Sequence, residues 1–427
     1  MSREDILRNE ELTFAEKIIN LKNVERNAKI LRAGEIAVVN VDATLAQDST
    51  TPLAILTLEE MGIKKLWDPS KVFFFIDHTY PAADEKVANM HKMMREFAAN
   101  YKCNIIEGSI SHQHMFEEVI VPGMMLIGAD SHTIMGGTLG AFATGVGSTE
   151  IASIWASGKT WLKIPESMLV VAKGELKKGV YSKDLILHFI GMIGEEGAAY
   201  KSIEWKGDTI DKMTIHSRAV LCNMGIEAGA KSSVIEVDDV TRDYLASVNR
   251  KPMYEIHSGS KADYEEKIEI ESDKLEPLVS APNNVDNVKH IREVEGVPID
   301  QAFVGSTTNA RLEDLEIVAR MIKGKRVKNG TRFIVTPASR KIYDDAIRLG
   351  LAYIFAEAGA VFTNATCGAC VGTHLGVLAN DEVCISSTNR NFIGRMGANS
   401  AKIYLASPAT VTASAIEGKI TDPRRYL

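Results

Sequence analysis

The sequence has few cysteines, no long apolar run and no block of like charges, and each absence argues against a class of protein. Five cysteines in 427 residues are too few for a disulfide framework, which favours a chain that works in the reducing cytoplasm. No stretch approaches the roughly 18 apolar residues that span a bilayer, and the charged start shows no export signal. The 49 basic and 56 acidic residues are interspersed, and the net charge of −7 disfavours a general nucleic-acid binder.

Short β-rich runs alternate with amphipathic helical runs along the chain. This pattern predicts an α/β fold with largely parallel strands. The expected strands are 36–41, 72–76, 124–127, 168–172, 332–335, 360–362 and 402–405, and the expected helices are 85–99, 149–158, 182–193, 340–349 and 409–417. Residues 182–184 and Ser339 precede apolar periodic runs and are interpreted as N-cap regions.

Two changes in composition divide the chain into three α/β/α domains. A glycine-rich stretch, 136–147, leads into a helix that ends near Gly158, and a new strand–helix unit begins near Pro165. The segment 276–284 contains prolines and has little periodicity, which is typical of a linker. We therefore predict domains at 1–163, 164–284 and 285–427.

Three histidines stand in a context that favours chemistry. His78 follows Asp77 at the end of an apolar strand, and His132 follows Asp130 and Ser131 between another strand and the glycine-rich stretch. His112 lies in the polar segment 108–113. Ligands of α/β sheets bind at the carboxyl ends of strands, and a carboxylate beside an imidazole favours proton transfer. The other histidines are interpreted as surface or satisfied core residues: His91, His114, His188, His216, His257, His290 and His374.

The glycine-rich stretch 136–147 does not have the spacing of a dinucleotide-binding fingerprint. No strand–turn–helix unit in it carries G-x-G-x-x-G followed by an acidic residue. Close packing of backbone near a ligand is the expected role of these glycines.

The C-terminal third contains two thiols on one tight turn, Cys367-Gly-Ala-Cys370. This spacing suits a metal or a cluster, although a lone CxxC can also be redox-active or half of a zinc site. Nearby, Arg390 and Arg395 follow an apolar run in one loop. Guanidinium groups bind carboxylates in bidentate fashion, so the pair suits a di- or tricarboxylate, whereas two surface ion pairs are the alternative.

These motifs, in this order, resemble the aconitase superfamily, in particular large subunits of the isopropylmalate-isomerase and homoaconitase type. The likeness runs from about Phe14 to the C-terminus. It is carried by Asp77-His78, His112-Gln113, Asp130-Ser131-His132-Thr133, the segment 223–230, Gly305-Ser306-Thr307-Thr308-Asn309, the CxxC and the segment 388–395. The resemblance implies three α/β domains around a central [4Fe-4S] cluster on three cysteines, whose open iron acts as a Lewis acid.

The resemblance also implies roles for individual residues. Three carboxylate–imidazole pairs would perform the acid–base catalysis: Asp77 with His78, Asp130 with His112, and Glu227 with His132. His78 would protonate the departing hydroxyl, and Ser131 would be a further catalytic residue. Asn223 and Asn389 would lie near the cluster, and Arg390 and Arg395 would hold substrate carboxylates. The base would come from a swivelling domain on a separate small subunit. The implied reaction is dehydration and rehydration of a hydroxy di- or tricarboxylate such as 3-isopropylmalate, as in leucine biosynthesis.

The chain departs from this pattern at the first cluster cysteine. The family has Gly-Ser-Cys-Thr-Asn where this chain has Thr307, and a protonated hydroxyl is a poor replacement for a thiolate at iron. Two interpretations follow. One is a hydro-lyase whose metal centre uses Cys367, Cys370 and an unusual third ligand, or another metal. The other is a cluster-free, non-catalytic scaffold or regulatory partner.

Overall fold

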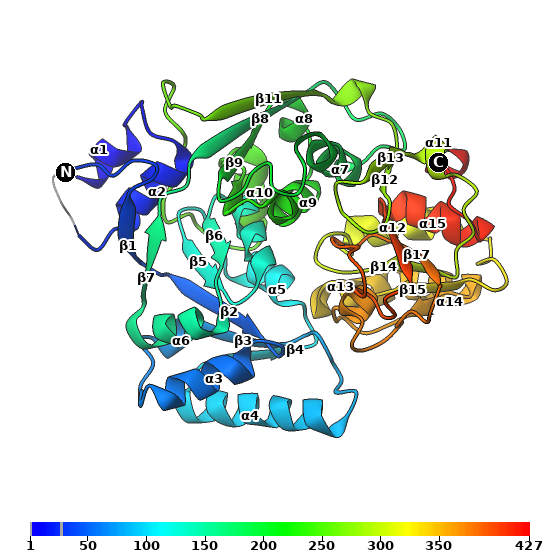
Figure 1. Ribbon diagram of the computed structural model, residues 1–427, viewed down its shortest axis with the longest axis horizontal. Helices are drawn as coiled ribbons and strands as arrows, with labels where there is room; N and C mark the ends of the chain where they lie inside the picture. The colour runs from blue at the N-terminus through cyan, green and yellow to red at the C-terminus, as the bar shows by residue number, and fades with distance from the viewer. Residues whose placement is uncertain (1, 26–28) are drawn as a thin grey trace.

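Three sheets built from consecutive parts of the chain form the framework of the protein, and the computed structural model describes residues 2–25 and 29–427 (Figure 1). The five-stranded sheet lies at the lower left of the view, the four-stranded sheet at the top and the seven-stranded sheet on the right. Most neighbouring strands are parallel, and helices lie between and around the sheets. The mixed α/β fold class expected from the sequence is confirmed.

The five-stranded sheet is parallel throughout and follows the order β4-β3-β2-β5-β6. Its interior strand β3, which lies between β4 and β2, is a run of five apolar residues that is almost entirely buried, as a strand covered on both faces requires. Its strands are β2 (Ala43–Gln47), β3 (Val72–Ile76), β4 (Asn104–Glu107), β5 (Met125–Gly128) and β6 (Phe142–Gly145). Its helices are α3 (Thr51–Glu60), η1 (Pro69–Lys71), α4 (Glu85–Tyr101), α5 (Ser111–Glu118), η2 (Ser131–Leu139) and α6 (Ser148–Ser157).

The four-stranded sheet is also parallel, with the order β10-β9-β8-β11. Its strands are β8 (Ser167–Lys173), β9 (Ser202–Lys206), β10 (Ser232–Val234) and β11 (Glu266–Glu271). Its helices are α7 (Ser182–Ile193), α8 (Asp208–Asp211), α9 (Ile215–Met224), η3 (Gly225–Ala228), α10 (Asp239–Ser247) and η4 (Ser272–Lys274). The N-cap residue expected within 182–184 is wrong, because the helix already begins at Ser182 and its N-cap residue is Tyr181. Lys183 lies in the first turn of α7 and is buried.

The seven-stranded sheet has the order β13-β12-β18-β17-β14-β15-β16, with β12 antiparallel to both of its neighbours. Its strands are β12 (Leu278–Ser280), β13 (Val288–His290), β14 (Gln301–Val304), β15 (Arg332–Val335), β16 (Val361–Phe362), β17 (Val383–Ser386) and β18 (Lys402–Leu405). Its helices are α11 (Ile291–Val294), α12 (Leu312–Ile322), α13 (Arg340–Arg348), α14 (Leu351–Ala358), η5 (Gly368–Val371), α15 (Pro408–Glu417) and η6 (Pro423–Tyr426). Ser339 caps α13 as expected, since its side chain accepts a hydrogen bond from the Ile342 amide.

The segment 276–284, expected to be an irregular linker, contains strand β12 of the seven-stranded sheet. Its prolines fall outside the strand, so the low periodicity reflects a strand of three residues rather than an extended loop. The domain limits at 163 and 284 stay predictions.

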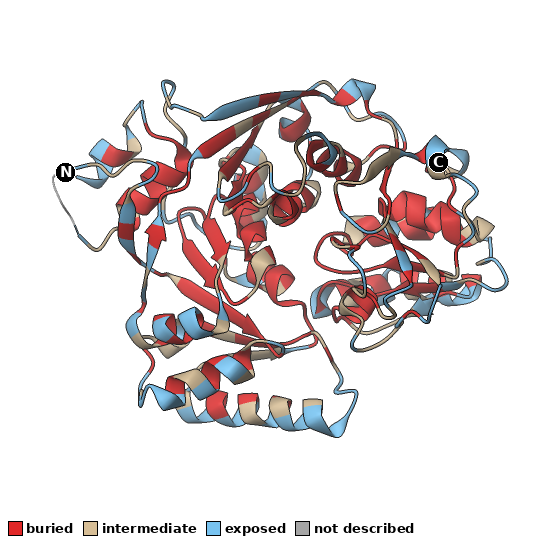
Figure 2. Cartoon of the chain, viewed as in Figure 1, coloured by how far each residue is buried: buried red, intermediate tan, exposed pale blue. Residues whose placement is uncertain are grey.

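The N-terminal part adds α1 (Arg3–Leu7), α2 (Phe14–Lys22) and a two-stranded antiparallel sheet of β1 (Ile36–Asn40) and β7 (Lys159–Lys163). Figure 2 shows the strands of the large sheets mostly buried, whereas α4 exposes one face. Among the described residues, no helix is both long and apolar enough to cross a membrane. The expected cytoplasmic location stays a prediction.

Candidate active site

The carboxyl ends of strands from two different sheets meet at one cavity of about 450 Å³. In the five-stranded sheet, Asp77 follows β3 directly and Asp130 follows β5 closely. In the seven-stranded sheet, the turns after β14 and β17 carry Thr307 and Arg390. Ten of the residues named from the sequence line this cavity: His78, His112, Asp130, His132, Thr307, Cys367, Cys370, Asn389, Arg390 and Arg395. Asp77, Ser131, Asn223 and Glu227 lie behind them, each bonded to a lining residue.

The first expected pair, Asp77 and His78, is present. His78 Nδ1 lies 2.7 Å from Asp77 Oδ1, and Asp77 itself is fully buried. Burial lowers the pKa of His78, but the neighbouring Cys367 and Asp77 raise it more, so the pKa lies well above the usual 6.5. The Asp77 carboxylate beside Nδ1 holds the imidazole in one orientation, which suits proton transfer at the cavity.

Asp130 connects the other two histidines. Its Oδ1 lies 3.0 Å from His112 Nε2 and accepts a hydrogen bond from the His132 amide at 2.8 Å. Burial raises the pKa of Asp130, but His112 and then His132 outweigh burial and hold the pKa well below its usual range. The carboxylate is therefore charged and suited to stabilise a protonated imidazole.

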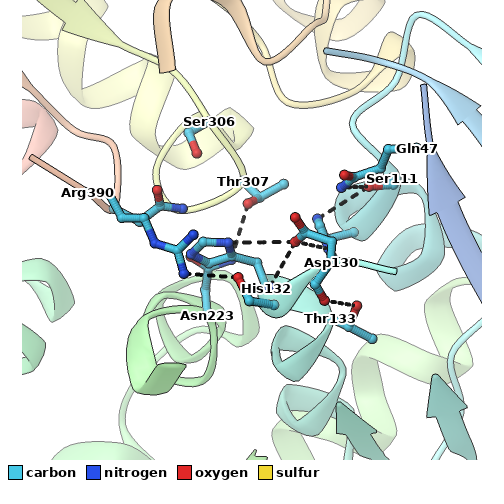
Figure 3. Close-up of polar contacts among 12 residues, drawn as sticks. Gln47, Ser111, Asp130, His132, Thr133, Asn223, Ser306, Thr307 and Arg390 are labelled. Carbon is cyan, nitrogen blue, oxygen red and sulfur yellow. Dashed lines mark hydrogen bonds and ion pairs between the residues drawn. The ribbon is translucent and has the colours of Figure 1, made fainter. Parts of the chain in front are cut away.

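Glu227 comes from η3, a different part of the chain, and joins His132 to the arginine loop. Its Oε1 lies 2.7 Å from His132 Nε2, and both its oxygens accept hydrogen bonds from Arg390 Nε at 3.0 Å. Arg390 Nη2 also donates to Ser131 Oγ at 2.9 Å (Figure 3). Burial raises the pKa of Glu227, whereas His132 and Arg390 lower it more. One carboxylate thus orients both an imidazole and a guanidinium.

Thr307 occupies the position where the resemblance implied a cysteine. Its Oγ1 accepts a hydrogen bond from Asn223 Nδ2 at 3.1 Å (Figure 3). Thr308 Oγ1 donates to Asn223 Oδ1 at 2.8 Å. The buried Arg311 donates to the carbonyl oxygens of Thr307 and Thr308 at 2.6 and 2.8 Å. The threonine hydroxyl is thus part of an ordered polar turn.

The two cysteines have different neighbours. Cys367 lies near Asp77 and His78: one ligand atom from each of the three residues falls within 4.8 Å of the others. Cys370 Sγ instead lies 3.8 Å from Asn389 Oδ1 and 3.6 Å from Arg395 Nη2, which donates to it. Among the described residues at this cavity, Asp77, His78, Cys367 and Cys370 offer atoms that could hold a metal or a cluster.

Asp48 is a site residue that the sequence reasoning missed. It follows β2, a strand that was not expected, and its carboxylate accepts hydrogen bonds from the backbone amides of His78 and Thr79 at 3.2 and 3.1 Å. His91 Nε2 lies 3.1 Å from the same carboxylate, so His91 is a satisfied core residue as expected. The adjacent polar residues Gln47 and Asp48 give only a weak signal in the sequence, because the run before them has no strong apolar pattern.

Close backbone packing explains why two positions of the stretch 136–147 are glycine. A Cβ on Gly137 would lie 1.9 Å from the carbonyl oxygen of Ser233, and one on Gly145 would lie 2.6 Å from that of Asp130. These glycines let η2 and β6 approach β10 and the Asp130 turn. The expectation of close backbone packing is confirmed for both positions.

A family model and similar relatives indicate the same family. The model of the aconitase family (aconitate hydratase) matches residues 16–298 and 289–418. A 3-isopropylmalate dehydratase large subunit of Archaeoglobus fulgidus is 45% identical over 419 residues, 97% of this chain and 99% of the relative. Relatives of the same name from Methanopyrus kandleri and Thermotoga maritima are 44% and 45% identical, with 97% of this chain and 99% of each relative covered.

Proposed function

Because this chain belongs to the aconitase family, we propose that it is the large subunit of a hydro-lyase that dehydrates and rehydrates a hydroxy di- or tricarboxylate. The observation that carries the proposal is the convergence of three carboxylate–imidazole pairs and two arginines on one cavity. Relatives that match over nearly their whole length are named large subunits, which supports a separate small subunit as partner.

In this proposal, each group of residues has a distinct task. Arg390 and Arg395 bind substrate carboxylates, which fixes the hydroxyl-bearing carbon beside His78. His78 donates a proton to the departing hydroxyl, which leaves as water, while a base from the small subunit removes the proton from the neighbouring carbon and the double bond forms. The pairs of Asp130 with His112 and of Glu227 with His132 keep those imidazoles oriented beside the cavity. Hydration is the same step in reverse: His78 takes a proton from water as the hydroxyl forms on carbon, and the small-subunit base returns its proton to the neighbouring carbon.

The residues present do not complete the ligand set of a [4Fe-4S] cluster. Cys367 and Cys370 offer two thiolates, but the third position is the Thr307 hydroxyl, already bonded to Asn223 at 3.1 Å. Cys384 and Cys222 lie in β17 and α9, and Cys103 lies just before β4, outside the cavity lining. A hydroxyl is a harder and far less acidic donor than a thiol, so no step of the proposal depends on a cluster.

The same threonine favours a second candidate function, a non-catalytic scaffold or regulatory partner. The two proposals differ in one measurement. The purified chain, with and without a saturating small subunit, is incubated with 3-isopropylmalate, methylmalate or dimethylmalate, and formation of the unsaturated acid is followed by absorbance. With homoaconitate, which is already unsaturated, the loss of absorbance on hydration is followed instead. Turnover that requires both subunits supports the hydro-lyase. Its absence with every acid, although the subunits form a complex, supports the scaffold.

A further inference from the structure

The side chain of Lys183 is fully buried and links α7, beside the four-stranded sheet, to the seven-stranded sheet. Lys183 belongs to α7, beside the four-stranded sheet, and its Nζ donates to the backbone carbonyls of Ser387 and Thr388 at 2.9 and 2.5 Å. Both acceptors follow β17 of the seven-stranded sheet. A buried amine is stable only when its donors are used, so these two bonds fix where the Lys183 side chain lies.

The two carbonyls belong to the residues directly before Asn389 and Arg390. Ser387 and Thr388 are fully buried, so solvent has no access to replace the amine as their donor. Ser387 Oγ accepts a hydrogen bond from the Gly305 amide and donates to the Asn309 carbonyl, each at 3.1 Å. The turn that Lys183 holds is therefore also tied to the turn that carries Thr307.

We infer that Lys183 is a positioning residue, whose amine holds the backbone of 387–388 so that Asn389 and Arg390 face the cavity. The inference rests on the proposed function, because that function gives Arg390 a substrate carboxylate to bind. Lys183 does not line the cavity, so any effect on substrate passes through the turn. A protonated amine has three N–H donors and a neutral one has two, so both bonds are possible in either state.

The variant Lys183→Met tests the inference, because methionine has a similar length and cannot donate. The matched control is Lys17→Met: Lys17 is also buried, at 3% exposure, and donates to the Leu7 carbonyl at 2.8 Å in the N-terminal part of the chain. The first readout is hydrogen exchange of the peptide covering 387–395 in the full chain. We expect faster exchange there in Lys183→Met and wild-type exchange in Lys17→Met.

The second readout is steady-state kinetics with the small subunit. A displacement of Arg390 by a fraction of an ångström to 1 Å is expected to raise KM for the diacid about tenfold or more in Lys183→Met. Lys17→Met is expected to stay within about twofold of wild type, since Lys17 lies in α2 and does not line the cavity. Adding Lys183→Met to Arg390→Ala should raise KM by no more than about twofold beyond that of Arg390→Ala alone, because Lys183 acts through the contact that Arg390→Ala already removes.

The two proposals fail in distinguishable ways. Unchanged exchange of 387–395 in Lys183→Met, or a KM equal to that of Lys17→Met in an active enzyme, overturns the positioning role. Absence of turnover in the wild-type complex overturns the proposed function, and the exchange measurement then still decides whether Lys183 holds the turn.

Discussion

Arg390 Nε donates hydrogen bonds to both carboxylate oxygens of Glu227, each at 3.0 Å. Because Glu227 also lies 2.7 Å from His132 Nε2, the arginine expected to bind substrate and the imidazole expected to move protons share one anchor. The side chains of Arg390 and Glu227 are 25% and 8% exposed, so the pair lies mostly out of solvent at the cavity wall. In the proposed function, substrate binding and proton transfer are therefore coupled through this carboxylate.

Arg390→Ala is expected to lower the unfolding free energy by about 2 kcal/mol, because Glu227 loses a charged hydrogen-bond partner. It should also lower kcat/KM for the diacid about 100-fold or more, by removing a carboxylate ligand. Denaturant unfolding and kinetics with the small subunit measure the two effects. Arg242→Ala is the control, since Arg242 pairs with Glu255 at the surface. Equal losses of activity in both variants would contradict the role of Arg390.

Thr307→Cys is expected to raise the iron and sulfide content of the chain after anaerobic reconstitution, because it supplies a third thiolate beside the cavity of Cys367 and Cys370. Thr307→Ser keeps the hydroxyl and should leave the iron content at the wild-type value. Iron analysis and the visible absorption spectrum of each protein provide the measurement. A wild-type chain that already holds about four irons would show that the threonine does not prevent cluster assembly.

Gly137→Ala is expected to destabilise the protein by about 1–3 kcal/mol, since the added Cβ would lie 1.9 Å from the Ser233 carbonyl oxygen and the backbones must separate. Gly147→Ala is the matched control, because the nearest heavy atom to its Cβ would be 3.7 Å away. Thermal and denaturant unfolding compare the two variants. A stability loss for Gly137→Ala no larger than that of the control would mean that η2 and β10 can move apart freely.

Glu236 is expected to stabilise the fold at neutral pH and to lose that effect in acid. Burial raises the pKa of its carboxyl, but His257 and Lys206 lower it more, to about 2. A carboxyl with a lowered folded-state pKa stabilises above about 4.5, its unfolded value, and this contribution is lost as the pH falls toward 2.

Glu236→Gln should therefore cost up to about 3 kcal/mol at pH 7, with the difference from wild type shrinking as the pH falls below 4.5. Unfolding by denaturant at pH 7 and at a series of lower pH values measures this difference. Glu269→Gln, at an exposed pair with Lys173, should differ from wild type by less than about 0.5 kcal/mol at every pH. A constant difference across the series for Glu236→Gln would contradict the expected protonation.

Much of the local structure could be predicted from the sequence, because it depends on neighbouring residues. Strand β3 and helix α7 have the expected bounds, and Ser339 caps α13 as expected. The short strand β2 was missed, because a run of Ala43–Gln47 with alanine, threonine and glutamine has no strong apolar pattern. Asp48, which depends on that strand for its place, was missed with it.

The sequence by itself determined the α/β pattern, the polar residues at strand ends and the CxxC of Cys367 and Cys370, since each can be read within a few neighbouring positions. Only the tertiary structure decided that Glu227 joins His132 across 95 positions, that Cys367 lies near Asp77 and His78, and that Lys183 reaches the turn before Asn389. Such contacts depend on how whole sheets pack against one another. Burial then decides which charges can persist, because a group removed from water stays charged only beside a partner.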